Sequence, residues 1–88
     1  MSGFKVSLTP EAQKDIKNLE PKLQVRILDR LEWIGQNAEF IRHQTLKGKE
    51  WQGCFKYRFG DYRIIYLLVT SDNNLIVLKI GHRREVYK

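Results

Sequence analysis

The sequence has little of what would cross-link a small chain or hold it in a membrane. Among its 88 residues there is one cysteine, Cys54, so an internal disulfide is excluded and a reducing compartment is expected. No run of about 18 apolar residues occurs, which excludes a membrane-spanning helix. The first residues lack the long apolar stretch of a secretory signal, so we expect a cytoplasmic protein with no membrane partner.

Metal-binding and phosphate-binding motifs are also missing. Cys54, His43 and His82 are too few and too scattered for a zinc site, and no cluster of carboxylates suggests a two-metal nuclease. There is no glycine-rich loop of the GxxxxGK[ST] type to cradle nucleotide phosphates. We therefore expect a protein that works without a metal or another cofactor.

What the chain does have is basic charge and a composition that suits one small core. The hydrophobic fraction of 42% and the aromatic fraction of 11% predict a single domain over residues 1–88. Lys and Arg outnumber Asp and Glu by 16 to 10, a net charge of +6. In Cys54–Lys88 only Asp61, Asp72 and Glu85 oppose the cations. This charge favours a polyanionic partner, nucleic acid or acidic protein, although a merely basic soluble protein has the same balance.

The first half of the chain predicts a short strand and two helices. Phe4–Leu8 alternates apolar and polar residues, as a strand does. Thr9 and Pro10 suit the N-cap and first position of a helix, Pro21 begins a second helix, and Gly35–Asn37 closes it. Both helices carry an apolar stripe that is expected to pack against a sheet. The stripe of the first helix consists of Ala12, Ile16 and Leu19, and that of the second consists of Leu23, Ile27, Leu31 and Ile34.

The second half predicts a three-stranded meander after a polar, irregular segment at 37–52. The strands are expected at Cys54–Phe59, Tyr62–Thr70 and Leu75–Ile80, with turn residues between them. The fold class is therefore α+β, in which the N-terminal strand and the helical hairpin pack on a small, mainly antiparallel sheet.

The strand Cys54–Phe59 alternates aromatic residues with cations. Successive side chains of a strand point to opposite faces, so its three aromatic residues can face the core while Lys56 and Arg58 share the other face. Strand pairing would bring Arg63 and Arg83 to the same basic face. The pattern predicts a phosphate-binding site there.

A cluster of cations beside a tyrosine is able to cleave RNA without a metal. The 2′-hydroxyl of the substrate attacks its own 3′ phosphate, and fixed guanidinium groups stabilise the charge that builds on the phosphoryl oxygens. A lysine crowded by other cations has its ammonium form disfavoured and can approach the role of general base. Basic strands with interleaved aromatic residues equally describe a nucleic-acid-binding surface without chemistry.

Two further residues allow a structural and a functional interpretation. Trp33 lies near Arg26, Asp29 and Arg30 on the polar side of the second helix. We expect it to tuck under the loop that follows, and the alternative is an exposed anchor for a partner protein. Glu85 is the carboxylate closest to the basic cluster, and we expect it to pair with a neighbouring arginine rather than to act as a general base.

The chain resembles the RelE/ParE superfamily of small bacterial toxins over essentially its whole length, and most of all the RelE branch. The order of the elements matches, and so do four local strings. The resemblance implies a type II toxin that cleaves messenger RNA in the A site of the 70S ribosome, without a metal, and so inhibits translation. It implies as partners the ribosome, the message and a small, acidic, DNA-binding antitoxin. The four strings are Leu46-Lys47-Gly48, Cys54-Phe55-Lys56-Tyr57-Arg58, Tyr62-Arg63-Ile64-Ile65-Tyr66 and Gly81-His82-Arg83-Arg84-Glu85-Val86-Tyr87.

The same resemblance implies catalytic roles for five residues. Lys56 matches a lysine that stabilises charge or shares the base role. Arg58 stands where the family has a lysine as the preferred general base, and arginine stays protonated at neutral pH. Either Lys56 takes over the base role or Arg58 only stabilises the phosphate. Arg63 matches the arginine that holds the scissile phosphate. Arg83 matches one that helps to protonate the 5′-oxygen leaving group, and Tyr87 matches a tyrosine that stacks on the substrate nucleotide.

Three more residues are candidates for contact with RNA: Lys47, His82 and Arg84. Lys47 falls where the family has a basic backbone contact. His82 can titrate near neutral pH, yet strand alternation points it away from Arg83, so we expect a structural role for it. Two alternative functions stay open, a ParE-like inhibitor of DNA gyrase and a non-catalytic basic module that binds an acidic peptide or nucleic acid. Tyr87 together with the full set of cations counts against the gyrase inhibitor.

Overall fold

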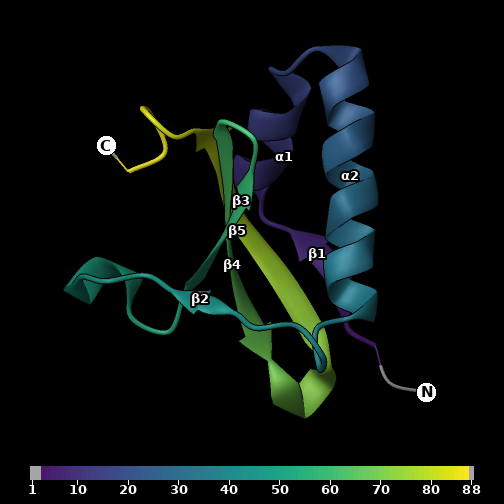
Figure 1. The fold of residues 1–88 in the computed structure, drawn as a ribbon, viewed down its shortest axis with the longest axis vertical. Coiled ribbons are helices and arrows are strands. Elements are labelled where there is room, and N and C mark those ends of the chain that lie inside the picture. The colour runs from purple at the N-terminus through teal and green to yellow at the C-terminus, as the bar shows by residue number, and fades with distance from the viewer. Residues whose placement is uncertain (1–2, 88) are drawn as a thin grey trace.

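Two helices cover one face of a five-stranded sheet (Figure 1). The computed structural model describes residues 3–87, and no helix in that range is long and apolar enough to cross a bilayer. The elements in chain order are β1 (Lys5–Leu8), α1 (Pro10–Lys17), α2 (Pro21–Gln36), β2 (Gln44–Thr45), the 3-10 turn η1 (Lys49–Trp51), β3 (Phe55–Phe59), β4 (Tyr62–Val69), the 3-10 turn η2 (Thr70–Asp72) and β5 (Asn74–His82).

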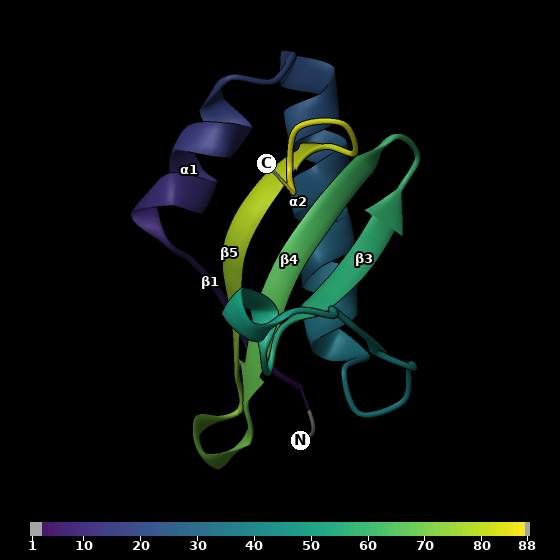
Figure 2. The same ribbon diagram turned by 90° about the vertical axis from the view of Figure 1, so that its left-hand side faces the viewer.

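The strand order is β1-β5-β4-β3-β2, with β1 parallel to β5 and all other pairs antiparallel. The predicted α+β class and the meander β3–β4–β5 are confirmed. Figure 2 turns toward the viewer the face of the sheet that α2 does not cover. We call it the open face, and it carries the side chains of β3 and β4 that alternate with those in the core.

The segment 37–52 is less irregular than the sequence suggests. Gln44 and Thr45 form β2 and pair with Lys56 and Phe55, and η1 follows. A strand of two exposed polar residues has no apolar alternation, so sequence periodicity gives no sign of it.

The helix boundaries follow the predicted signals. The hydroxyl of Thr9 accepts the N–H of Ala12 at 3.2 Å, and a proline begins each helix. Helix α2 runs through Gly35 and ends at Gln36, and Gly35 lies where the N-terminal strand approaches the helix. A Cβ on Gly35 would stand 2.7 Å from the carbonyl oxygen of Phe4, so only glycine permits this approach.

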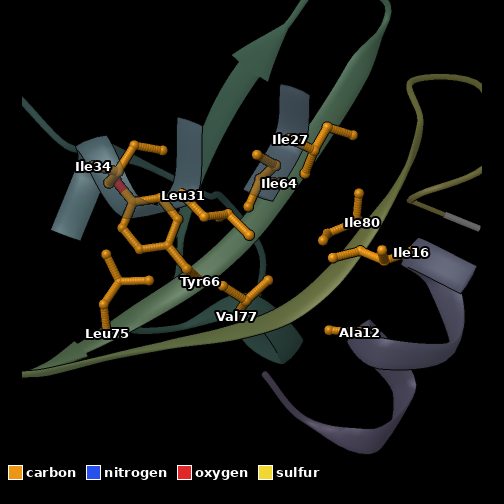
Figure 3. Packing of buried hydrophobic residues seen from close by; sticks show 10 residues of the cluster. All are labelled: Ala12, Ile16, Ile27, Leu31, Ile34, Ile64, Tyr66, Leu75, Val77 and Ile80. Atoms are coloured by element: carbon orange, nitrogen blue, oxygen red, sulfur yellow. The ribbon is translucent and has the colours of Figure 1, made fainter. Parts of the chain in front are cut away.

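The main core lies between the helices and the sheet (Figure 3). Tyr66 is its largest fully buried side chain, and its hydroxyl bonds to Nδ1 of His43. Nε2 of His43 bonds to the carbonyl oxygen of Ala38 at 2.7 Å, so Nε2 carries the proton and Nδ1 accepts from the tyrosine. Burial, and then the nearby Tyr57, raises the pKa of Tyr66 to about 12. The buried members of this core are Ala12, Ile16, Ile27, Leu31, Ile34, Ile64, Tyr66, Leu75, Val77 and Ile80.

Beyond the end of β1, helix α1 protects the outer edge of β5. The carbonyl oxygen of Val77 accepts the N–H of Thr9 at 3.0 Å, and the carboxylate of Asp15 accepts the N–H of Ile80 at 2.9 Å. Between them Leu78 has no partner across the ladder, because the register shifts there. The Asp15 carboxylate of α1 thus accepts a backbone N–H of β5 that the short β1 does not reach.

A second, smaller cluster lies on the open face. It consists of Cys54, Ile65 and Val86, with Leu46, Trp51 and Leu78 packed around it. These residues come from the β2–β3 segment, the sheet and the C-terminal turn. The cluster therefore fastens two irregular segments to the open face, where Figure 2 shows the C-terminal turn in front of the sheet.

Candidate active site on the open face of the sheet

The register of β3 and β4 sets the cations of the open face. Arg58 stands directly opposite Arg63, and Lys56 stands opposite Ile65. The aromatic residues of β3 pack against the main core, so the predicted division of this strand into an apolar and a cationic face is confirmed. Like charges directly opposite each other on a sheet cost about 0.2–1 kcal/mol. An anion between the two guanidinium groups would remove that cost.

Arg63 is held in place by the turn that joins β3 to β4. Its side chain is buried, and its Nη1 donates to the carbonyl oxygens of Gly60 at 3.0 Å and Tyr62 at 2.9 Å. These bonds engage one nitrogen of the guanidinium group, so Nε and Nη2 are not committed to the turn. Arg63 is therefore a preorganised cation, which is the form that stabilises developing charge best.

The C-terminal turn brings Arg83 and Tyr87 back to the open face. It folds back by backbone bonds, since the carbonyl oxygen of His82 accepts the N–H groups of Glu85 at 2.8 Å and Val86 at 2.9 Å. Val86 is fully buried beside Gly81, where a Cβ would lie 3.5 Å from the Cβ of Val86. Tyr87, the next residue, is 42% exposed. Val86 thus anchors the turn that carries both candidate residues.

Arg83 is tied to the β3–β4 turn that also holds Arg63. Its N–H donates to the carbonyl oxygen of Asp61 at 2.8 Å, and its Nε lies 3.9 Å from Asp61 Oδ1. The two side chains are 53% and 68% exposed, so the ion pair itself is weak. The backbone bond fixes the position of Arg83, and the guanidinium group stays accessible to a substrate.

His82 lies outside this group of cations. Its ring meets that of Tyr62 edge-on, with centroids 5.6 Å apart, and Nδ1 accepts the N–H of Arg84 at 3.2 Å. Alternation from Ile80, which lies in the main core, places His82 on the helix side. This placement fits the structural role expected from strand alternation.

The remaining predicted RNA contacts are exposed. Arg84 lies in the C-terminal turn and Lys47 in the loop before η1, next to Leu46 of the open-face cluster. The structure thus brings together Lys56, Arg58, Arg63 and the turn with Arg83 and Tyr87. Among residues 3–87, no three His, Cys, Asp or Glu side chains gather where they could hold a metal ion.

The sequence interpretation missed the anchoring role of Val86. A single apolar residue in an otherwise charged C-terminal string was the available signal, because Val86 stands between Glu85 and Tyr87 in a run that begins with His82-Arg83-Arg84. A lone apolar residue among charged residues is expected to be buried, because burial removes its side chain from water. Its position against Cys54 and Ile65, however, depends on the folded sheet.

Comparison with known proteins agrees with this fold. The family model of the ParE toxin of type II toxin-antitoxin systems (parDE) matches residues 6–87. Toxin RelG of Mycobacterium tuberculosis is 24% identical over 85 residues, 97% of each chain. Putative toxin RelE1 of Methanocaldococcus jannaschii is 27% identical over 88 residues, 97% of this chain and 96% of the relative.

Among solved structures, a chain of the RelBE2 toxin-antitoxin complex from Mycobacterium tuberculosis superposes with a TM-score of 0.83. The two chains are 21% identical, and the match covers 97% of each. This likeness supports the fold of two helices on a five-stranded sheet. Because the family model spans nearly the whole chain, the chain belongs to the ParE toxin family of type II toxin-antitoxin systems, in the RelE/ParE superfamily, and its similarity to RelG and RelE1 supports the RelE branch.

Proposed function

We propose that this toxin is an endoribonuclease that cuts messenger RNA in the ribosomal A site, without a metal, and so inhibits translation. The observation that carries the proposal is the pair Arg58 and Arg63, opposed across two strands of the open face. The C-terminal turn adds Arg83 and Tyr87 to the same face. Two opposed guanidinium groups suit the non-bridging oxygens of a phosphodiester.

The proposed reaction uses a nucleophile from the substrate. Lys56 takes the proton of the 2′-hydroxyl, whose oxygen attacks the adjacent phosphorus. Arg58 and Arg63 stabilise the charge on the phosphoryl oxygens. The bond to the 5′-oxygen breaks, Arg83 stabilises that oxygen until it takes a proton from water, and Tyr87 stacks on the nucleotide. Lys56 then returns its proton to the solvent. The products are a 2′,3′-cyclic phosphate and a 5′-hydroxyl end.

The ribosome has a defined role in this proposal. The attacking and leaving oxygens both belong to the RNA, so the rate depends on holding them in line with the phosphorus. A free strand samples many conformations, whereas the ribosome holds the message in one. The toxin then supplies charge stabilisation and proton transfer to a strand that is already oriented.

We propose a small, acidic, DNA-binding antitoxin as the second partner. The solved relatives from Mycobacterium tuberculosis and Pyrococcus horikoshii are RelB–RelE-type complexes of toxin and antitoxin. A net charge of +6, with the opposed arginines on an accessible face, favours an acidic segment that covers the site. Co-purification with an acidic protein encoded beside the toxin gene tests this partner, and an inert toxin that needs no such protein contradicts it.

The function is tested by inducing the toxin without an antitoxin and mapping transcript ends. We expect new ends inside translated messages, and we expect Arg83→Ala to lose both the ends and the toxicity. An Arg83→Ala variant as toxic as the parent, with translated messages intact, contradicts the proposal.

A gyrase inhibitor is the second candidate, because the matching family model is named for ParE. It predicts supercoiling defects and a DNA-damage response while translation continues. A non-catalytic basic module predicts a third result. In that case Arg63→Ala weakens nucleic-acid or peptide binding and changes its salt dependence, with no effect on RNA integrity.

A further inference from the structure

A groove lies on the helix side of the molecule, outside the open face. It has a volume of about 500 Å³ and is lined by Arg26, Asp29, Arg30, Trp33 and Phe59. Trp33 is 41% exposed there, so the expectation that it tucks under the following loop is wrong. Phe59, at the end of β3, is the other aromatic residue of the lining. The packing of the main core does not explain why the indole of Trp33 is exposed.

Both aromatic rings of the groove are paired with arginines. Cζ of Arg30 lies 5.2 Å from the centroid of Trp33, and Cζ of Arg26 lies 5.3 Å from the centroid of Phe59. On α2, Arg30 follows Arg26 by four positions and Trp33 follows Arg30 by three, so the three residues share one face of the helix. The rings restrain the two guanidinium groups, which lowers the entropy cost of binding an anion.

The groove continues toward the active site. A smaller hollow shares Arg26 and Phe59 with it and extends over Gly60, Asp61 and Tyr62, the turn that holds Arg63 and Arg83. Strand β2 pairs only with Phe55 and Lys56 of β3, so the Arg58 end of β3 forms an outer edge within residues 3–87. Arg58 and Phe59 are neighbours on opposite faces of that edge. A strand bound on the open face therefore reaches the groove by passing around it.

We propose that this groove, which we call the α2 groove, binds single-stranded RNA next to the cleaved nucleotides. One base stacks at Trp33, and Arg26 and Arg30 contact the adjoining phosphates. The inference rests on the proposed function, since it extends the same RNA beyond the active site. Stacking on aromatic rings together with arginine contacts is how proteins hold unpaired RNA.

Asp29 favours RNA over an acidic peptide as the ligand of the α2 groove. It lies between the two arginines along the helix and lines the same groove. A carboxylate only accepts hydrogen bonds, and RNA offers it donors in the 2′-hydroxyl and the base amino groups. The carboxylate side chains of an acidic peptide offer no such donor.

The test compares two oligouridylates of about 4 and about 12 nucleotides, one long enough for the active site alone and one that also reaches the groove. All proteins carry Arg83→Ala so that the RNA stays intact, and Trp51→Phe so that the tryptophan fluorescence comes from Trp33. Onto this background are placed Arg30→Gln and Trp33→Leu. Arg42→Gln, an exposed arginine outside the groove, is the control matched in charge. Because the Trp33→Leu variant lacks the fluorescent indole, its RNA binding is measured with a fluorescent label on the RNA.

We expect the longer RNA to bind about tenfold more tightly than the shorter one, the effect of one base–aromatic stack. It should quench Trp33 fluorescence, whereas the shorter RNA should not. Arg30→Gln and Trp33→Leu should remove the tenfold gain and leave the shorter RNA unaffected. Arg30→Gln should also lower the slope of log affinity against log salt by about 0.7. Arg42→Gln should change neither affinity.

Equal affinity for both RNAs, with Arg63→Ala still weakening both, overturns the α2 groove and leaves the proposed function standing. If the protein binds neither RNA and Arg63→Ala changes nothing, both the α2 groove and the proposed function are overturned. Quenching of Trp33 by polyglutamate but not by RNA assigns the groove to an acidic protein segment and also overturns the proposal.

Discussion

Replacing Val86 by alanine should release the C-terminal turn from the open face without unfolding the domain. Val86 is fully buried against Cys54 and Ile65, in a cluster separate from the main core. The change removes two buried methyl groups at about 0.8 kcal/mol each and leaves a small cavity, a cost of about 1.5–2.5 kcal/mol. That cost shifts the equilibrium between the docked and the released turn by about 10- to 70-fold.

The effect should be local because Val86 packs in a cluster separate from the main core, which the change leaves intact. Hydrogen exchange at the Val86 N–H, which bonds to the carbonyl oxygen of His82, should speed up by the same 10- to 70-fold. Exchange in the centre of β4, at Ile64, should stay unchanged. Cleavage on programmed ribosomes should slow in parallel with the released fraction, because Tyr87 leaves the site and Arg83 is then held by its backbone bond to Asp61.

The matched control is Val25→Ala, since Val25 is 59% exposed on α2 and the chemical change is identical. It should alter neither exchange nor cleavage. The reasoning is refuted if the Val86 N–H keeps its protection in Val86→Ala, or if the variant loses as much protection at Ile64 as at Val86. Full cleavage by a variant whose turn has been released refutes the link between the turn and activity.

Three other changes follow from the contacts of single residues. Arg58→Lys replaces one guanidinium group of the opposed pair by a point charge, so cleavage on programmed ribosomes should slow, and an unchanged or faster rate contradicts the charge-stabilising role proposed for Arg58. Tyr66→Phe leaves Nδ1 of the half-buried His43 without its donor, so the free energy of unfolding should fall by about 1 kcal/mol in denaturant titrations, and an unaltered midpoint contradicts the bond. The pKa of Tyr66 is raised to about 12 from 10.0, so its neutral form stabilises the folded state below pH 10, and that stabilisation disappears as the pH rises through 12. The stability of the parent relative to Tyr66→Phe should therefore fall by about 2–3 kcal/mol between pH 10 and pH 12, and a constant difference refutes the burial argument.

The parts of the fold that the sequence predicts are those that depend on local rules. Thr9 and Pro10 mark the first helix because capping and the missing N–H of proline act within one turn. Alternation along Phe55–Phe59 predicts the two faces of β3 because the strand period is fixed. Such features need no knowledge of what lies across the sheet.

The parts that the sequence does not predict depend on contacts between distant segments. Strand β2 exists because Gln44 meets Lys56 across a loop, and its two residues carry no pattern of their own. Trp33 is exposed in a groove whose lining includes Phe59 of β3, and Phe59 pairs with Arg26. The buried guanidinium group of Arg63 donates to a carbonyl oxygen of the turn, and no charge pattern in the sequence indicates this bond.

The candidate site shows both limits. Lys56, Arg58 and Arg63 share the open face, as alternation and strand pairing indicate. The return of Arg83 and Tyr87 to that face depends on the buried Val86 and on the Asp61 carbonyl. Sequence pattern alone cannot fold a chain end back on its own sheet.

The central claim is tested most directly with purified toxin, ribosomes programmed with a defined message, and the same message free in solution. We expect a cut within the A-site codon that leaves a 2′,3′-cyclic phosphate and a 5′-hydroxyl end and that requires the ribosome. The double variant Arg63→Ala/Arg83→Ala should fold and make no cut. An intact message on the ribosome, or a cut that leaves a 5′-phosphate end, would contradict this proposal.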